Sequence, residues 1–451
     1  MRISVIGTGY LGAVHAACMA ELGHDVLGID SDERKIAALQ AGHAPFYEPG
    51  LAELLVSATG AGTLRFSTSI AEAAAFAEVH FICVGTPQLP GALGADLSYI
   101  EAVIKALVPS LTQDCLLVGK STVPVGTAAR LAARIADLVP AGISAGLAWN
   151  PEFLREGYAV EDTLRPDRLV VGATAAAHDD VLRAVYEPLL EAGIPYVTTD
   201  LATAELAKVA ANAFLATKIS FINAMASVCE AASADVVTLA EALGHDTRIG
   251  RRFLAAGLGF GGGCLGKDIR AFIARADELG VAESVRFLRQ VDEINGGRRR
   301  RAVDLARELV GGSFAGQRVA VLGASFKPET DDVRDSPALS VASAIHAEGA
   351  EVRVHDPKAI DNARAACPEL DYADGPLKAC EDTDVILHLT EWREYRELDP
   401  ARVLEVVRAP RILDARNVLP VAAWQAAGWT FRSMGAHVPE SPLIPGPPAT
   451  R

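Results

Sequence analysis

Apolar residues in the first half of the chain fall in short runs separated by longer amphipathic stretches. The run Ile3–Ile6 predicts a strand that leads through a glycine turn into an alanine-rich helix ending near Leu22, and Asp25–Ile29 predicts a second strand. This alternation of strand and helix is typical of a doubly wound sheet of buried parallel strands. Later runs that predict further strands of this sheet are Val79–Val84, Cys115–Val118, Leu169–Val171 and Pro195–Thr198.

The stretch from Leu201 to Leu243 contains neither glycine nor proline, which predicts helix. It is too long for one ordinary helix, and Ser233-Ala234-Asp235 offers a cap for a second one. We therefore expect a long helix over 201–231 and then a shorter helix. The helical segment is expected to continue to about Asn295 and to stop at Gly296-Gly297.

A second strand–helix alternation follows the glycine pair. Arg318–Gly323 predicts a strand, residues 336–348 a helix, and Glu351–His355 another strand, with further strands at Val385–Leu389 and Arg411–Leu413. The fold class is therefore α/β, with two Rossmann-like doubly wound sheets joined by a long central helix. The expected segments are 1–199, 200–297, 298–436 and a proline-rich tail at 437–451.

The charge balance narrows the possible partners. The 451 residues carry a net charge of −15, which argues against a general nucleic-acid or anionic-membrane partner, because both require broad basic surfaces. The basic run Arg298–Arg301 is interpreted as a solvated helix start or as charge for an anionic ligand, with nucleic acid as the weaker interpretation. We find no stretch long and apolar enough to span a membrane, and the apolar start runs directly into a glycine turn, unlike a signal peptide.

The seven cysteines form no CxxC pair and no metal-ligand spacing, so no metal site is expected. An odd, scattered set of thiols is typical of the reducing cytoplasm, and we expect a cytoplasmic protein.

The clearest motif is the glycine turn Gly7-x-Gly9-x-x-Gly12, which follows a strand and opens a helix. Its glycines permit a tight turn and close approach of a pyrophosphate, and the helix N-terminus favours the phosphates. Asp30 closes the next strand about twenty residues further on and would accept hydrogen bonds from ribose hydroxyls. Because a carboxylate repels a 2′-phosphate, the pattern predicts NAD rather than NADP.

Several other segments permit both a functional and a structural interpretation. Val84–Pro87 and Lys120–Thr127 end strands where a cofactor crevice would lie, but they also suit ordinary loops. Glu152 and Glu156 would share a helix face, or would serve only the dipole of a helix start. On the long helix, Lys208 and Asn212 share a face, although a lysine there usually reaches solvent.

Glycine is concentrated around Cys264, where six of the ten residues from 257 to 266 are glycine. So much flexible backbone indicates that something approaches it closely. Cys264 with nearby Lys267 and Asp268 is either a nucleophile or a buried cysteine in a glycine turn. A charged loop containing Lys327 and Arg334 would serve an anionic group or would simply be solvated, and no glycine fingerprint precedes it.

Seven ordered motifs resemble those of the nucleotide-sugar 6-dehydrogenases, the UDP-glucose/GDP-mannose dehydrogenase family, over nearly the whole chain. This resemblance implies an N-terminal NAD domain, a central helix that forms a dimer or higher oligomer, and a C-terminal domain for a nucleotide sugar. It also implies double oxidation of a sugar C6 alcohol to a carboxylate with two NAD. The motifs are GTGYLG, VGTP, STVPVGT, NPEFLREG, AELAKVAANAFLATKISFINA, GFGGGCLGKD and SFKPETDDVRDS.

The resemblance also implies roles for individual residues. Cys264 would form a thiohemiacetal and then a thioester, and Lys208 and Asn212 would stabilise the oxyanion. Asp268, with Thr122 and a water, would handle protons, and Glu152 would orient or activate the hydrolytic water. Lys267 would favour the thiolate.

Binding residues follow from the same motifs. The implied cofactor residues are Gly7, Gly9, Tyr10, Leu11, Gly12, Asp30, Lys35, Gly85, Thr86, Thr122, Glu156, Lys267 and Arg334. The implied sugar-nucleotide residues are Glu152, Phe153, Leu154, Arg155, Glu156, Lys208, Asn212, Phe253, Leu254, Ala255, Ala256, Gly257, Gly261 and Lys327. Arg248 resembles an arginine that reaches the substrate of a neighbouring subunit.

The chain departs from the family pattern at two positions. The family often has serine and proline in its cysteine loop where this chain has Gly263 and Gly266, which leaves the geometry of the loop open. The expected reaction converts UDP-glucose to UDP-glucuronate, with dTDP-glucose, GDP-mannose or a UDP-N-acetyl hexosamine as competing candidate substrates. Two further hypotheses are a two-electron β-hydroxyacid dehydrogenase and a catalytically inactive nucleotide sensor.

Overall fold

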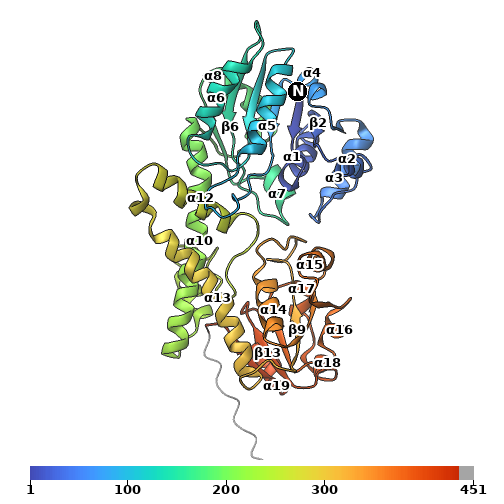
Figure 1. Cartoon of the computed structure of the whole chain (residues 1–451), viewed down its shortest axis with the longest axis vertical. Coiled ribbons are helices and arrows are strands. Elements are labelled where there is room, and N and C mark those ends of the chain that lie inside the picture. The colour runs from blue at the N-terminus through green and yellow to red at the C-terminus, as the bar shows by residue number, and fades with distance from the viewer. Residues whose placement is uncertain (436–451) are drawn as a thin grey trace, which may run out of the picture. The chain divides into compact units, whose positions relative to one another are not determined.

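The computed structural model describes residues 1–435, so the predicted proline-rich tail at 437–451 lies outside the described residues. The chain divides into two compact units. The first contains residues 1–213 and 267–286, and the second contains residues 214–266 and 287 onward. Figure 1 shows in each unit a sheet with helices on both faces, which confirms the expected α/β class with two doubly wound sheets.

The sheet of the first unit has eight strands in the order β3-β2-β1-β4-β5-β6-β7-β8. Its first six strands are parallel, as predicted for β1, β2, β4 and β5, whereas β3 and β6 were not predicted from the sequence. Because β7 pairs with β6 in the antiparallel direction and β8 pairs with β7 in the parallel one, the expectation that Leu169–Val171 and Pro195–Thr198 run parallel to the other strands is wrong. The short α7 and the turns around it reverse the chain between β6 and β7. The strands are β1 Arg2–Ile6, β2 Asp25–Ile29, β3 Leu64–Ser67, β4 Val79–Ile82, β5 Cys115–Gly119, β6 Ala145–Trp149, β7 Leu169–Ala173 and β8 Tyr196–Thr199.

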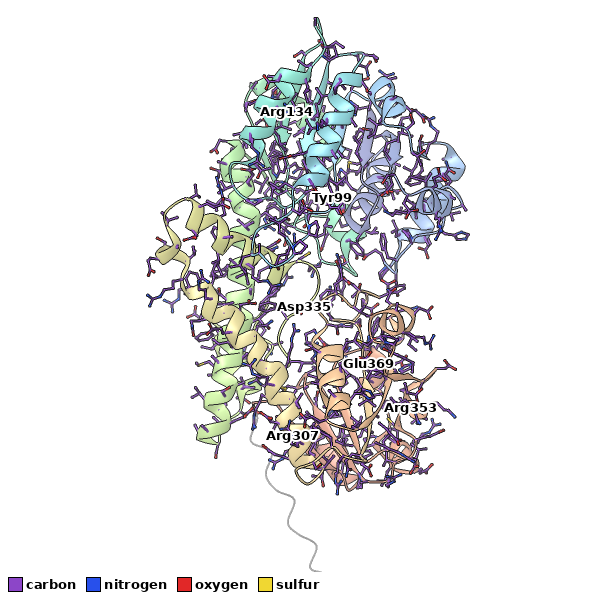
Figure 2. The ribbon with its side chains drawn as sticks, in the orientation of Figure 1. Tyr99, Arg134, Arg307, Asp335, Arg353 and Glu369 are labelled. Carbon is purple, nitrogen blue, oxygen red and sulfur yellow. The ribbon has the colours of Figure 1, made fainter. Side chains whose placement is uncertain are left out.

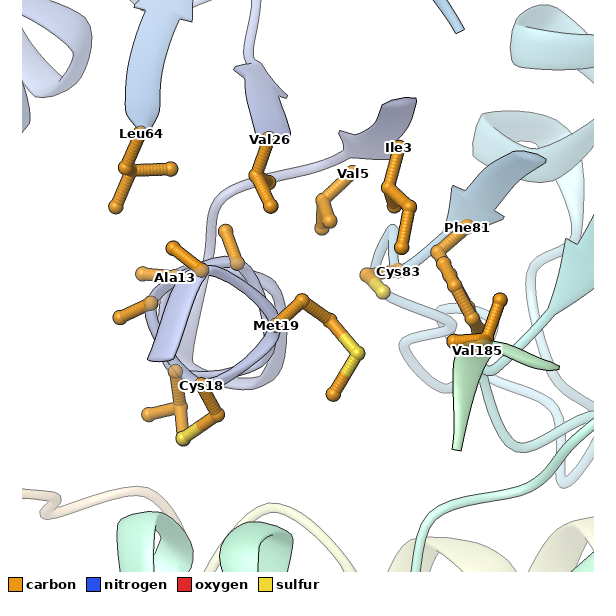
Figure 3. Packing of buried hydrophobic residues seen from close by; sticks show 14 of the residues in the cluster. Ile3, Val5, Ala13, Cys18, Met19, Val26, Leu64, Phe81, Cys83 and Val185 are labelled. Atoms are coloured by element: carbon orange, nitrogen blue, oxygen red, sulfur yellow. The ribbon is translucent and has the colours of Figure 1, made fainter. Parts of the chain in front are cut away.

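Alternate residues of these strands enter two separate cores, as a pleated sheet covered on both faces requires. Val5 and Phe81 pack with α1, whose alanines let the helix approach the sheet closely, as Figure 3 shows. Their neighbours Ile6 and Ile82 pack on the opposite face. The helices are α1 Tyr10–Glu21, α2 Glu33–Gln40, α3 Leu51–Ala61, α4 Ile70–Phe76, α5 Ser98–Leu107, η1 Val108–Ser110, α6 Thr127–Leu138, α7 Ala159–Leu164, α8 Ala176–Val185 and α9 Glu187–Glu191.

The predicted long helix is α10, Leu201–Ala232, and its shorter successor is α11, Val236–Gly244. The Asp235 carboxylate caps α11 by accepting from the backbone N–H of Thr238, as the sequence predicts. By length and composition alone α10 is also apolar enough to cross a membrane, so the expectation that no stretch has this property is wrong. However, α10 also buries several polar side chains, among them Glu205, Lys208, Asn212, Ser220 and Asn223.

The predicted stop at Gly296-Gly297 is wrong, because α13 runs without a break from Phe287 to Leu309. Burial on both sides of the glycine pair, including Asn295 and Arg298, holds the helix. The idea of a solvated helix start at Arg298–Arg301 is wrong too, since Arg298 is buried and donates to the Gly257 carbonyl oxygen. The other helical elements near this segment are α12 Leu265–Glu278 and η2 Ala282–Val285.

The sheet of the second unit repeats the strand order of the first six strands of the other sheet, as β11-β10-β9-β12-β13-β14. All of its strand pairs are parallel. Its strands are β9 Arg318–Leu322, β10 Glu351–His355, β11 Asp371–Tyr372, β12 Val385–His388, β13 Arg411–Asp414 and β14 Thr430–Ser433, and its helices are α14 Pro337–Ala347, α15 Ile360–Ala366, α16 Pro376–Cys380, α17 Arg393–Arg396, α18 Pro400–Leu404 and α19 Val421–Ala426.

Several arginines on the surface of this unit are paired with carboxylates rather than gathered in a basic patch. Arg307 lies within 2.7 Å of both Asp304 and Glu348, and Arg353 lies 3.0 Å from Asp371. Arg307 and Arg353 are labelled in Figure 2. This pairing accords with the net charge of −15.

Candidate active site

In the glycine turn after β1, Gly7 and Gly12 pack closely against neighbouring atoms, whereas the backbone at Gly9 is open. Gly7 has a φ of +91° and donates from its N–H to the Ile29 carbonyl oxygen at 2.7 Å. A Cβ on Gly12 would collide with the Gly7 carbonyl oxygen, so α1 meets the turn only through glycine. A Cβ on Gly9 would meet no atom within 4 Å, and Gly9 caps α1 without a side-chain hydrogen bond. The exposed helix N-terminus suits a phosphate.

Asp30 lies beside this turn at the end of β2, with 10% of its side chain exposed. Its carboxylate accepts from the Thr8 N–H at 2.9 Å and from Lys35 Nζ at 2.7 Å. Burial opposes ionisation, but the hydrogen bonds from Lys35 and from the Asp32 N–H outweigh it and hold the pKa of Asp30 below its usual value. A charged acceptor therefore stands where the ribose of NAD would lie, and the residues present fit NAD.

Tyr10, at the start of α1, connects the turn to a distant loop. The Tyr10 hydroxyl donates to Glu48 Oε2. The Gly157 N–H donates both to the Tyr10 hydroxyl oxygen and to Glu48 Oε2. The other Glu48 oxygen accepts from the Ala159 N–H at 2.7 Å at the start of α7. Glu48 is 5% exposed. Leu11 packs against the core of this unit. The turn and the end of the NPEFLREG loop are thus joined through one buried carboxylate.

Glu152 and Lys208 form a buried ion pair. Glu152 Oε1 lies 2.8 Å from Lys208 Nζ, with 11% and 5% of the two side chains exposed. The other Glu152 oxygen accepts from the Leu154 N–H at 2.7 Å, and the Phe153 ring lies 5.7 Å from Lys208 Nζ. The helical interpretation of Glu152 and Glu156 is wrong, because helix starts only at Ala159. The expectation that Lys208 reaches solvent is wrong as well.

A chain of polar contacts continues from α10 to the first turn of α12. Asn212 Nδ2 donates to Asp268 Oδ2 at 2.7 Å, and Lys267 Nζ lies 3.0 Å from Asp268 Oδ1. Lys267 also donates to the Thr86 carbonyl oxygen at 3.1 Å, and Thr86 Oγ1 donates to the Thr122 carbonyl oxygen at 2.7 Å. A small pocket lies along this chain, lined by Thr122, Lys267, Asp268 and nearby apolar side chains. Gly85, which precedes Thr86, leaves open backbone, because a Cβ there would meet no atom within 4 Å.

Cys264 immediately precedes α12, whose first turn carries Lys267 and Asp268. It is exposed, which excludes the interpretation as a buried cysteine in a glycine turn. Every other cysteine is buried or half-buried. Burial raises the pKa of the Cys18, Cys83, Cys115 and Cys380 thiols to about 12. An exposed sulfur at a helix N-terminus is the reactive arrangement for a cysteine.

Two of the glycines before Cys264, Gly257 and Gly262, are required by the packing of the protein itself. A Cβ on Gly257 would lie 2.5 Å from the Ala415 carbonyl oxygen, and one on Gly262, which has a φ of +80°, would lie 2.9 Å from the Phe326 ring. A Cβ on Gly263 would lie 2.7 Å from the Arg334 guanidinium, which ends a flexible and 62% exposed side chain and can move aside. What approaches this backbone is therefore the second unit's own sheet-end loops.

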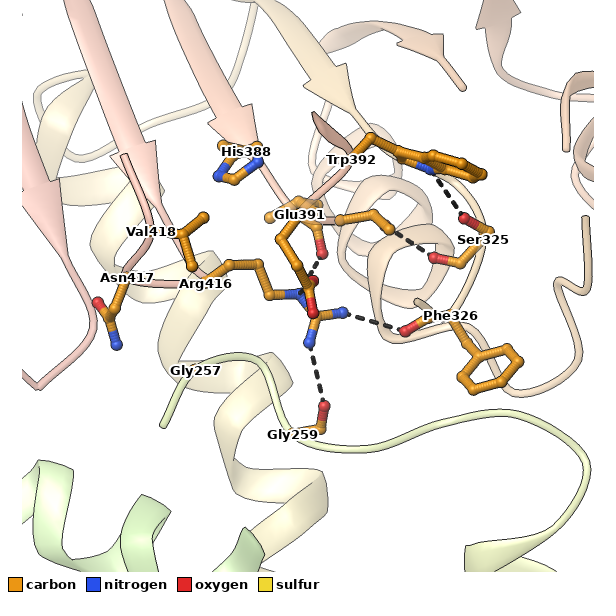
Figure 4. Close-up of polar contacts among 12 residues, drawn as sticks. Gly257, Gly259, Ser325, Phe326, His388, Glu391, Trp392, Arg416, Asn417 and Val418 are labelled. Carbon is orange, nitrogen blue, oxygen red and sulfur yellow. Dashed lines mark hydrogen bonds and ion pairs between the residues drawn. The ribbon is translucent and has the colours of Figure 1, made fainter. Parts of the chain in front are cut away.

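Arg416 ties this glycine loop to the sheet of the second unit. Its guanidinium donates to the carbonyl oxygens of Gly259 at 3.3 Å and Phe326 at 3.2 Å, as Figure 4 shows. It also pairs with Glu391 at 3.2 Å, and 11% of the side chain is exposed. Arg416 lies in no sequence motif, so its role in holding the glycine loop is recognised only from the contacts of its guanidinium.

The remaining candidate residues lie in varied settings. Arg248 is 87% exposed and pairs with Asp246 at 2.6 Å, and Arg155 pairs with Asp162 at 2.6 Å. Arg334 pairs with Asp332 at 2.6 Å, with 62% of its side chain exposed. In the 253–257 segment, Phe253 has a φ of +65°, Leu254, Ala256 and Gly257 are buried, and Ala255 is exposed. Gly261 is buried, Lys327 lies with its Nζ 5.8 Å from the Phe326 ring, and Glu156 is half-buried.

The candidates are divided between the two units along the chain. The first unit carries the glycine turn, Glu152, Lys208, Asn212 and Asp268, and the second carries Cys264 and most of the other proposed sugar-nucleotide residues. The first unit also contains buried polar residues to which sequence patterns assign no role. Asn150 begins the NPEFLREG motif and Lys120 directly precedes the STVPVGT motif, but neither pattern gives these residues a role, and Tyr186 lies in no motif.

Three domain profiles of one family match the chain in order. The "NAD binding domain" matches residues 1–190, the "central domain" 202–296 and the "UDP binding domain" 320–421. The chain belongs to the UDP-glucose/GDP-mannose dehydrogenase family. Its first sheet is therefore the NAD-binding sheet of the family, and its second is the UDP-binding sheet.

Relatives in this family match over almost their full length. UDP-glucose 6-dehydrogenase of Rhizobium meliloti is 41% identical, covering 96% of this chain and 99% of the relative. The enzyme of the same name from Pseudomonas aeruginosa is 39% identical, covering 96% and 97%. Among solved structures, a UDP-glucose dehydrogenase from Pyrobaculum islandicum has a TM-score of 0.89 at 38% identity, covering 96% of this chain and 98% of that one.

Proposed function

We propose that this protein oxidises the C6 alcohol of UDP-glucose twice, giving UDP-glucuronate and two NADH. The observation that carries the proposal is the buried polar cluster of the first unit, where Lys208, Asn212 and Asp268 lie in one hydrogen-bonded neighbourhood beside the NAD sheet. Relatives named UDP-glucose 6-dehydrogenase, 39–41% identical, favour glucose as the sugar. A UDP-D-ManNAc dehydrogenase from Pyrococcus horikoshii is only 26% identical.

When bound, NAD would supply the hydride acceptor for each of the two oxidations at C6. Gly9 and the N-terminus of α1 would hold its pyrophosphate, and the Asp30 carboxylate its adenosine ribose. The other proposed contacts are Tyr10, Leu11, Lys35, Gly85, Thr86, Thr122, Glu156, Lys267 and Arg334.

In the first oxidation, the C6 hydroxyl loses its proton as the carbon loses a hydride, which yields an aldehyde. Asp268, working with Thr122 and a water, would take the proton. The Lys208 ammonium and the Asn212 amide would stabilise negative charge on the sugar oxygen. Both groups are already oriented, Lys208 by Glu152 and Asn212 by Asp268, so little reorganisation is required.

In the second oxidation, the Cys264 thiolate attacks the aldehyde carbon and the oxygen takes up a proton. The resulting thiohemiacetal loses a hydride from carbon and a proton from oxygen, leaving a thioester. Water then adds to the thioester carbon, a proton passes to Glu152, the carbon–sulfur bond breaks and the thiolate is regenerated. The N-terminus of α12 and Lys267 favour the thiolate throughout.

The test is the NADH yield per UDP-glucose for the wild type and for Cys264→Ser, with Cys367→Ser as the control at a half-buried cysteine. We expect two NADH for the wild type and the control, and no acid at a normal rate from Cys264→Ser. One NADH per substrate would instead favour a two-electron dehydrogenase, and binding without turnover would favour a sensor. A panel with dTDP-glucose, GDP-mannose and a UDP-N-acetyl hexosamine tests the choice of sugar nucleotide.

A homodimer or higher oligomer forms part of the proposal. Phe214, Phe221 and Val228 follow each other at seven-residue spacing on α10 and are 66%, 48% and 56% exposed. A stripe of this spacing suits packing against a second copy of the helix, and Arg248 would then reach the neighbouring substrate. Light scattering of Phe221→Glu should report a smaller particle than the wild type. An unchanged mass would contradict this interface.

The segments would divide the work, with 1–199 for NAD and 298–436 for the nucleotide sugar, which the names of the matching family domains support. Residues 200–297 would serve catalysis and oligomerisation. We place the protein in the cytoplasm, without nucleic-acid or membrane partners. Its acidic balance and the lack of any disulfide among residues 1–435 support this placement.

A further inference from the structure

Lys120 is a buried cation that the proposed reaction does not use. It directly follows β5, is 5% exposed, and donates from Nζ to Asn150 Oδ1 at 2.9 Å. Nζ also lies 3.5 Å from the Tyr186 hydroxyl and from the Asn150 carbonyl oxygen. A buried ammonium is costly to keep in a fold, and an apolar side chain would usually serve packing better. Its presence at a sheet end beside a reaction centre is therefore a reason to look for a function.

The partner of Lys120, Asn150, is held from every side. Its side-chain oxygen also accepts from the Tyr186 hydroxyl at 2.6 Å, and its side-chain nitrogen donates to the Val170 carbonyl oxygen at 2.8 Å. Its backbone N–H donates to the Gly119 carbonyl oxygen at 2.8 Å. Asn150 is 1% exposed. The end of β5, the strand β7 and the junction of α8 with α9 thus converge on one residue.

Asn150 directly follows β6 and is the first residue of the loop that carries Glu152. Pro151 restricts both its own φ and the conformation of Asn150, so little freedom separates the held amide from the next residue. Glu152 then forms its 2.8 Å ion pair with Lys208. Any rotation at Asn150 would therefore move the Glu152 carboxylate relative to Lys208.

We propose that Lys120 is a positioning residue that, through Asn150 and Tyr186, holds the Glu152 carboxylate against Lys208 in the reactive arrangement. The role given to this ion pair rests on the proposed function. The positioning itself rests only on the contacts among these buried side chains.

The protonation of Lys120 makes this role sensitive to pH. Burial lowers the pKa of Lys120 to about 8, although the nearby Glu152 carboxylate opposes the shift. Above that pH the ammonium loses its proton and its hydrogen bond to Asn150 weakens. We therefore expect the positioning to fail on the alkaline side. The titratable groups that face Lys120 are Cys83 after β4, Glu152 before α7, Tyr186 before α9, Lys208 on α10 and His15 on α1.

The test compares Lys120→Met with the wild type in the full-length protein, with the exposed Lys105→Met as the matched control. Methionine keeps the length and flexibility of the side chain, so the variant should fold. Amide hydrogen exchange over residues 150–157 should accelerate about tenfold in Lys120→Met alone. With UDP-glucose and NAD, kcat should fall on the order of tenfold to hundredfold, with KM for NAD within about twofold of the wild type.

The pH profile separates positioning from simple loss of structure. The wild-type kcat should decline above about pH 8, where Lys120 loses its proton. This alkaline limb should be absent in Lys120→Met, and in Asn150→Asp it should move to higher pH, because a carboxylate would hold the ammonium in its charged form. Unchanged hydrogen exchange over 150–157 in Lys120→Met would overturn the proposal even if UDP-glucose proved not to be a substrate. A kcat within twofold of the wild type would overturn it as well.

Discussion

The two sheets of this protein begin with the same strand and the same turn, yet only one turn is suited to a dinucleotide. Gly7 and Gly323 both follow the first strand of their sheets with φ values of +91° and +112°. Each donates its N–H to the last residue of the second strand, Ile29 at 2.7 Å and His355 at 2.8 Å. The backbone conformation at the first residue after the first strand is therefore equivalent in the two sheets.

The difference begins two residues later. In the first sheet Gly9 leaves open backbone and α1 starts at once with Tyr10. In the second sheet Ser325 takes that place, and a long loop runs to Ser336 before α14 starts. Ser336 caps α14 and donates to the Ala324 carbonyl oxygen at 2.6 Å. The second helix N-terminus is thus satisfied by the protein and not left for a phosphate.

The acid at the end of the second strand differs in the same way. Asp30 keeps 10% of its side chain exposed, whereas Asp356 is 1% exposed. Asp356 accepts from six donors of the protein, which are the N–H groups of Ala324, Ser325, Lys358 and Ala359, the Ser325 hydroxyl and the Trp392 indole. One carboxylate can still receive a ligand and the other has become part of the fold. Two sheets with the same strand order therefore need not bind the same ligand.

The largest effect should come from Gly12→Ala, because the added Cβ would collide with the Gly7 carbonyl oxygen and backbone cannot move aside easily. We expect the free energy of unfolding to fall by about 4 kcal/mol, with loss of NAD binding. Urea denaturation followed by circular dichroism measures this. The control is Gly60→Ala on α3, where a Cβ meets nothing within 4 Å and alanine should stabilise the helix. Equal effects of the two variants would contradict the packing role of Gly12.

Asp356→Ala should destabilise the second unit by roughly 3 kcal/mol, because several buried donors lose their acceptor. The NAD affinity should not change, and calorimetric titration of the folded variant measures it. Asp361→Ala, at an exposed acid of α15, should leave the denaturation midpoint unchanged. A loss of NAD affinity in Asp356→Ala would mean that the second sheet also binds the cofactor.

Asp30→Ala should mainly weaken NAD binding, whereas Asp356→Ala should mainly lower stability. Removal of the acceptor for the ribose should raise the Kd for NAD by at least about tenfold, while the midpoint of denaturation should fall less than in Asp356→Ala, because Asp30 accepts fewer hydrogen bonds from the protein and is more exposed. The exposed Asp137 on α6 offers a matched control, Asp137→Ala, with wild-type affinity expected. If Asp30→Ala bound NAD like the wild type, the proposed contrast between the two acids would be lost.

The smallest effect should come from Gly9→Ala. No protein atom lies within 4 Å of the added Cβ, so stability should stay close to the wild type. The methyl group would stand in the path of the pyrophosphate, and the Kd for NAD should rise about fivefold. Calorimetric titration decides between this result and unchanged affinity, which would place the phosphates elsewhere.

Local patterns were sufficient to predict most strands and the long helix, because buried runs and the absence of helix breakers act within a few residues. They failed where distant packing outweighed local preference. Gly296-Gly297 lies within α13, since Asn295 and Arg298 are buried on the helix that contains it. Likewise, Glu152 and Glu156 have helical spacing, but the loop that carries them is held by Lys208 and by contacts to Gly157.

Residue types and their spacing were sufficient to predict the two α/β sheets, the glycine turn with Asp30 and the family to which the chain belongs. Those features depend on residue types at fixed spacing, and spacing is visible in one dimension. No local pattern predicts that Lys208 is buried against Glu152, that Cys264 is exposed, or that Lys120 donates a hydrogen bond to Asn150. Burial and hydrogen-bond partners depend on residues far apart in the chain, and these set the charge and position of each reactive group.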